Sequence, residues 1–71
     1  MAEEMLSPLA GKILKVDLNV GAEVKEDDDA FLVEAMKMEN PIYVPCNGKV
    51  TEVKVKEGDD VEEDDLLAII E

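Results

Sequence analysis

The sequence predicts an all-β domain, a flattened β-barrel or sandwich of two four-stranded antiparallel sheets related by a pseudo-two-fold axis. Three observations predict it: the second half of the chain repeats the first, apolar residues alternate with polar ones, and turn-forming residues recur at short intervals. Helical periodicity is not sustained in any segment. The length of 71 residues suits one small domain, expected to span residues 1–71.

The repeat becomes visible when the sequence is shifted by 37 residues. Many of the aligned residues are identical, and several of them are Pro, Gly or Asp, which form turns. The aligned segments include Pro8 with Pro45, Gly11-Lys12-Ile13 with Gly48-Lys49-Val50, Gly21 with Gly58, and Glu26-Asp27-Asp28 with Glu63-Asp64-Asp65. Such agreement along one unbroken offset predicts two halves with the same fold.

Each half is expected to contain four strands, because apolar residues alternate with polar or charged ones between the turn signals. The alternating residues include Leu14, Val16, Leu18 and Val20 in the first half and Ile42, Val44 and Cys46 in the second. The expected strands cover residues 4–7, 12–18, 23–25, 30–36, 38–44, 49–55, 60–62 and 66–70.

The charge and composition exclude several classes of partner. Nineteen acidic residues and seven lysines give a net charge of −12, which repels both nucleic acid and anionic membrane surfaces. Phe31 and Tyr43 are the only aromatic residues, too few to stack single-stranded bases. The N-terminus lacks the features of a signal peptide and no apolar run could span a bilayer, so we expect a cytoplasmic protein with no membrane partner.

The residues that most enzymes use for acid–base or metal chemistry are scarce. The chain has no histidine, and Cys46 is its single cysteine, so a zinc site of ordinary ligands and an imidazole-based catalytic dyad are excluded. The alternation around Cys46 predicts a half-buried packing role for it. The run Asp27-Asp28-Asp29 lacks the ligand spacing of a calcium loop and is interpreted as turn chemistry. We therefore expect no metal and no independent catalytic activity.

Lys37 stands at the junction between the two copies of the repeat. Apolar strand residues precede and follow it, which leaves two or three residues around it to reverse the chain in a tight hairpin. An exposed lysine on a rigid turn suits covalent attachment of a carboxylate through an amide bond. Met36 and Met38 flank it, and exposed methionines suit a flexible docking surface for a modifying enzyme or for the attached group.

The segment Glu34-Ala35-Met36-Lys37-Met38 resembles the attachment motif of biotinyl domains, the biotin carboxyl carrier modules of biotin-dependent carboxylases and decarboxylases. The resemblance covers essentially the whole chain. It implies the fold shared by biotinyl and lipoyl domains, with biotin joined covalently to Lys37 by a biotin protein ligase. It further implies that Met36 and Met38, beside Ala35 and Glu34, are recognised by that ligase.

The same resemblance implies that the biotin carries a carboxyl group between two partners, a biotin carboxylase and a carboxyltransferase or decarboxylase. Two other functions stay open: a lipoyl carrier of an oxo-acid dehydrogenase complex, and an unmodified lipoyl-like domain used only for protein interaction. Lipoyl domains typically have Asp-Lys-Ala where this chain has Met36-Lys37-Met38, so the methionines favour biotin.

The chain departs from the pattern of the biotinyl family at three places. Asp27 and Asp64 stand where glycine is common, and they are expected to adopt a left-handed backbone at some cost. Ala30 replaces a larger aliphatic residue, which suggests a lighter core beside Phe31. A protruding thumb found in some acetyl-CoA carboxylase carriers is missing, which favours a pyruvate, propionyl-CoA or methylmalonyl-CoA type of parent enzyme.

Overall fold

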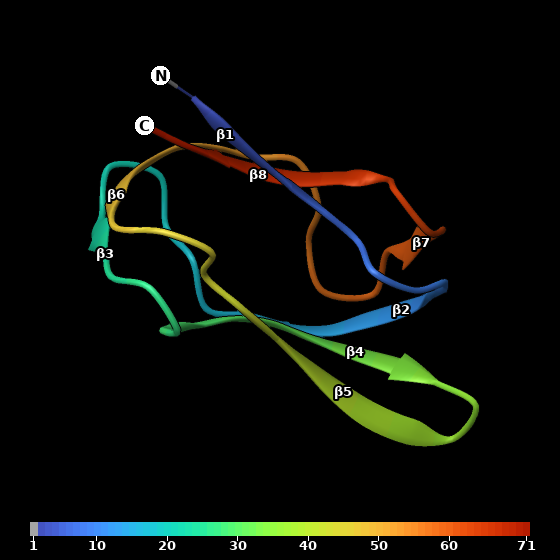
Figure 1. The fold of residues 1–71 in the computed structure, drawn as a ribbon. Coiled ribbons are helices and arrows are strands. Elements are labelled where there is room, and N and C mark those ends of the chain that lie inside the picture. The colour runs from blue at the N-terminus through green and yellow to red at the C-terminus, as the bar shows by residue number, and fades with distance from the viewer. Residues whose placement is uncertain (1) are drawn as a thin grey trace.

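The computed structural model describes residues 2–71, which form eight β-strands and no helix (Figure 1). All eight strands lie within two residues of the predicted ranges. They are β1 (Glu3–Leu6), β2 (Gly11–Val16), β3 (Glu23–Val24), β4 (Asp29–Ala35), β5 (Met38–Tyr43), β6 (Gly48–Val53), β7 (Asp60–Val61) and β8 (Leu66–Ile70).

The strands form two antiparallel four-stranded sheets, as predicted, with the orders β1-β8-β6-β3 and β5-β4-β2-β7. The shift of 37 residues carries each strand of one sheet onto the strand at the same place in the other, so the repeat is a pseudo-two-fold symmetry of the fold. In this relation the β4–β5 pair corresponds to the β8–β1 pair. A hairpin joins β4 to β5, whereas β1 and β8 lie beside the two termini, at the opposite end of the molecule (Figure 1).

Irregularities in the strand register explain where simple alternation failed. The register shifts between Ile13 and Lys15, so Ile13 is fully buried while Leu14 is only half-buried. Val20 lies beyond the end of β2 and is 65% exposed, so the prediction that it continues an inward-facing series is wrong. A second register shift, related to the first by the repeat, lies between Val50 and Glu52. A bulge places one extra residue in a strand, which reverses the faces on which the following side chains lie.

The small side chain of Ala30 in the first half of the repeat aligns with a large buried side chain in the second half. Ala30 and Phe31 are both buried, and the repeat aligns them with Leu67 and Ala68, which are also buried. Strand β4 therefore has the small residue before the large one, and strand β8 has the large residue before the small one. The exchange gives the two halves the same pair of buried side-chain sizes, which keeps their core volumes similar. The lighter packing beside Phe31 stays a prediction.

The acidic clusters form turns, as predicted, and their geometry is the same in both halves. Asp27 and Asp64 have φ angles of 73° and 72°, the left-handed conformation expected where related sequences use glycine. The neighbouring side chains cap these turns. Asp28 Oδ2 accepts the backbone N–H of Lys25 at 2.9 Å, and Asp65 Oδ2 accepts that of Glu62 at 2.8 Å.

Two glycines allow the strands to approach closely at each end of the molecule. A β-carbon at Gly11 would overlap the backbone carbonyl of Glu34, and one at Gly48 would lie 2.6 Å from the carbonyl oxygen of Glu71. These two positions are related by the repeat. The absence of a side chain at Gly11 therefore lets β4 lie against β2 directly below the hairpin that carries Lys37.

Replacing Gly48 with alanine should therefore lower the free energy of unfolding by about 1–3 kcal/mol, because backbone must move to accommodate the added carbon. Urea unfolding monitored by circular dichroism measures the change. Lys49→Ala on the same strand is the matched control and should change stability by no more than about 0.5 kcal/mol, since its side chain is exposed. Equal effects of the two substitutions would contradict the assigned close approach.

Candidate cofactor-attachment site

The candidate site is the hairpin that joins β4 to β5. Its strands pair up to Ala35 and Met38, so Met36 and Lys37 alone form the reversal. Both have positive φ angles, 54° for Met36 and 64° for Lys37, as a two-residue type I′ turn requires at its central positions. The predicted tight hairpin is therefore confirmed, with two turn residues.

The backbone of this turn is strained by its own sequence. Type I′ turns strongly prefer Asn-Gly, because residues with a β-carbon crowd the following carbonyl when φ is positive. Here a methionine and a lysine occupy those positions, at a cost of about 1–2 kcal/mol per residue. Strain of this kind persists where surrounding structure enforces it and is concentrated at functional sites.

The tip places its side chains in solvent. Met36 is 94% exposed and Met38 is 66% exposed, and Lys37 between them is exposed as well. Two large apolar side chains thus flank an accessible amine on a molecule that buries most of its other large apolar residues. Lys37 makes no ion pair within residues 2–71, so its amine is not held against the surface.

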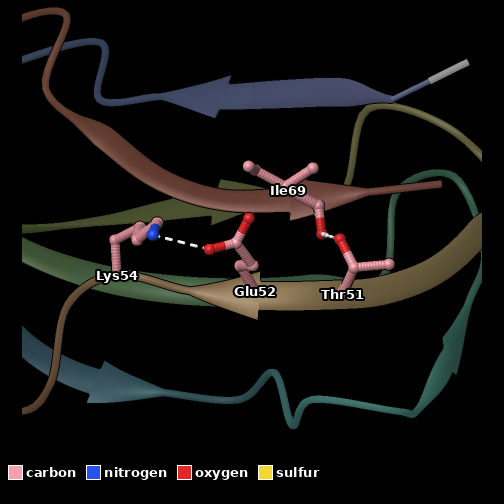
Figure 2. A network of polar contacts seen from close by, with 4 residues as sticks. All are labelled: Thr51, Glu52, Lys54 and Ile69. Carbon is pink, nitrogen blue, oxygen red and sulfur yellow. Dashed lines mark hydrogen bonds and ion pairs between the residues drawn. The ribbon is translucent and has the colours of Figure 1, made fainter.

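The strand lysines have a different setting. Lys54 pairs with Glu52 at 2.6 Å on the outer surface of β6 and the loop after it, where Thr51 also bonds the backbone of β8 (Figure 2). Lys15 lies 3.4 Å from Asp17. Such exposed pairs contribute little to stability, about 0.2–1 kcal/mol each, and they support the prediction that these lysines are solvated parts of strand faces.

The base of the hairpin is held by backbone pairing and by one amide side chain. Asn40 Nδ2 donates to the carbonyl oxygens of Met38 at 3.1 Å and of Val33 at 3.4 Å, next to the first residues of β5. In the strand register Glu34 lies opposite Lys12 of β2 on one side and opposite Glu39 of β5 on the other. Sequence reasoning did not single out Lys12, Glu39 or Asn40; their place beside the motif follows from strand register.

The five predicted site residues therefore lie together on one hairpin. Lys37 and Met36 form the tip, Met38 follows it, Ala35 is half-buried, and Glu34 is exposed in the ladder below. Residues 2–71 contain no cluster of His, Cys, Asp or Glu that could hold a metal ion. The same residues include no helix suited to crossing a membrane.

The sequence matches the biotin/lipoyl family, described as "Biotin-requiring enzyme", over residues 3–70. Similar proteins include the biotin carboxyl carrier protein of Streptococcus mutans, 51% identical over 58% of this chain, and the methylmalonyl-CoA decarboxylase subunit gamma of Veillonella parvula, 43% identical over 62%. The mitochondrial methylcrotonoyl-CoA carboxylase subunit alpha of Oryza sativa is 45% identical over 59% of this chain. The chain spans 32%, 34% and 6% of these relatives, respectively.

The structure is also similar to part of a much larger enzyme. The urea carboxylase of Kluyveromyces lactis superposes with a TM-score of 0.90 and 37% sequence identity, covering 99% of this chain and 6% of the carboxylase. The chain therefore belongs to the biotin/lipoyl family. Within that family it is a biotinyl domain.

The strain in the turn predicts that Met36→Asn raises the free energy of unfolding by about 0.5–1 kcal/mol, because asparagine tolerates positive φ. Met38→Asn is the matched control. It replaces a second exposed methionine at a position where φ is not positive, and it should give no gain. Urea unfolding of the three proteins makes the comparison, and a gain in the control alone would contradict the assigned turn.

Proposed function

We propose that Lys37 is the residue to which biotin is attached and that the loaded domain is a biotin carboxyl carrier module of a biotin-dependent carboxylase or decarboxylase. The observation that carries this proposal is the setting of Lys37: an exposed, unpaired amine at the tip of a rigid two-residue turn between two exposed methionines. The other six lysines, on or beside strands, do not lie in such a turn. Ala35 and Glu34 complete the site on the strand that leads into the turn.

The attachment reaction needs little from this chain except presentation. A biotin protein ligase would supply biotin as an acyl-adenylate, whose activated carboxyl carbon is attacked by the Lys37 amine. An amide forms, AMP leaves, and the amine loses a proton. Because the turn fixes the backbone on both sides of Lys37, the ligase meets one conformation and loses less entropy in binding it.

Met36 and Met38 would supply most of the apolar contact in that encounter. Both side chains are free of the core, so they can adapt to the ligase without disturbing the fold. Their thioether chains are flexible and polarizable, which suits a surface that must first meet a ligase and later meet other active sites. The exposure of both side chains beside Lys37 supports the proposal that a ligase recognises them.

The carrier role follows from the position of the hairpin. Biotin supplies the carboxyl-carrying ring, and the lysine side chain supplies a flexible link to the protein. The hairpin lies opposite the termini, so any neighbouring domain or linker attached there leaves the tip free (Figure 1). Tethering raises the local concentration of the carried group at each active site within reach. The partners would be a biotin carboxylase and a carboxyltransferase, with the domain working in the cytoplasm.

The lipoyl alternative is supported less well. One of the relatives compared above is named biotin carboxyl carrier protein and the others are named as carboxylases or decarboxylases. Met36 and Met38 also differ from the Asp-Lys-Ala pattern typical of lipoyl domains. Co-expression with a biotin protein ligase should give the biotin adduct in intact-mass analysis, whereas co-expression with a lipoate ligase should give none. A lipoyl adduct alone would overturn the proposed cofactor, and the absence of both adducts would support an unmodified interaction domain.

Substituting Lys37 should abolish biotin attachment without unfolding the domain. Lys37→Arg keeps the positive charge but removes the primary amine, so incubation with a biotin protein ligase, ATP and biotin should leave no streptavidin-reactive product. Lys49→Arg, on an exposed position of β6, is the matched control and should be labelled at the rate of the unsubstituted protein. Labelling of Lys37→Arg would show that another amine is the acceptor.

A further inference from the structure

The methionines within residues 2–71 fall into two classes by exposure. Met5 belongs to β1 and is 4% exposed, with its side chain in the core, whereas Met36 and Met38 are 94% and 66% exposed. The two exposed methionines are the residues that flank Lys37. A reagent that attacks methionine sulfur from solvent will therefore reach the attachment site before it reaches the core.

Hydrogen peroxide is the class of oxidant that suits this surface. In the reaction a sulfur lone pair takes one oxygen atom from the peroxide, the O–O bond breaks, and water leaves; the sulfur is oxidised by two electrons and the peroxide is reduced. The net charge of −12 repels anionic oxidants, while neutral peroxide approaches freely. No acid, base or metal from the protein is needed for this step.

Oxidation at these positions would change recognition and leave folding intact. The sulfoxide converts a flexible apolar side chain into a polar one. Neither side chain belongs to the core, and Met38 is held by backbone pairing with Ala35, which the sulfoxide does not touch. A partner that buries these side chains would have to desolvate two polar groups that it was not built to satisfy.

We propose that Met36 and Met38 form a peroxide-sensitive modification site whose oxidation to sulfoxide prevents loading of Lys37, and whose reduction restores it. The inference rests on the proposed attachment at Lys37. It deepens that proposal by adding a condition for loading: both sulfurs must be in the thioether form. Methionine sulfoxide reductases, which reduce both sulfoxide epimers between them, would reverse the block.

The test begins with the purified, unloaded protein treated with hydrogen peroxide. Peptide mapping should locate sulfoxide on Met36 and Met38 while Met5 stays unmodified. Treated and untreated samples are then incubated with a biotin protein ligase, ATP and biotin. The treated sample should show a kcat/KM for biotinylation lower by about tenfold or more, the equivalent of about 1.4 kcal/mol of lost binding. Thermal unfolding should be unchanged, and reductase treatment should restore the rate.

The double variant Met36→Leu/Met38→Leu is the matched control, compared only with itself before and after peroxide. It lacks the sulfurs of Met36 and Met38 but keeps Met1, Met5 and Cys46, so peroxide should not change its rate. An equal loss in this variant would assign the effect to another group and overturn the inference. An unchanged rate of biotinylation of the wild-type protein with sulfoxide on Met36 and Met38 would also overturn the inference. Failure of the untreated wild-type protein to accept biotin would instead contradict the proposed attachment at Lys37.

Discussion

The turn at Met36 and Lys37 is the constraint on which the function of this domain depends. Two residues with β-carbons are held at positive φ because β4 and β5 pair up to the residues immediately outside them. The ladder leaves no room for a longer and more relaxed loop. As a result the lysine amine projects from a fixed point, and the methionines on either side lie in solvent where a partner can contact them.

The rest of the fold supports that hairpin through the internal repeat. Buried residues of both sheets form one shared core. In that core the pair Ala30 and Phe31 aligns with the pair Leu67 and Ala68, with the large and small side chains in opposite order. Gly11 brings β2 directly under β4, next to the hairpin. The same symmetry relates the hairpin to the β1–β8 pair, whose strands are not joined by a turn. The chain termini lie at the end of that pair opposite the hairpin (Figure 1).

Much of the fold could be predicted because the repeat presents the strand and turn signals twice. The positions of all eight strands, the pseudo-two-fold relation of the halves and the left-handed conformation of Asp27 and Asp64 were predicted from the repeat and from local turn chemistry, whereas the strand order within each sheet was not. The bulge at Leu14 could not be predicted, because a bulge adds one residue to a strand without changing the composition of the strand.

The site divides in the same way. The exposure of Lys37 follows from its place between two copies of one unit, and the structure confirms it. The neighbours Lys12, Glu39 and Asn40 depend on strand register and were not predicted. The most direct test of the account is peptide mapping of the biotin-labelled protein. Biotin on Lys37 alone, at one group per chain among the seven lysines, is the predicted result; biotin on any of the other six lysines would contradict it.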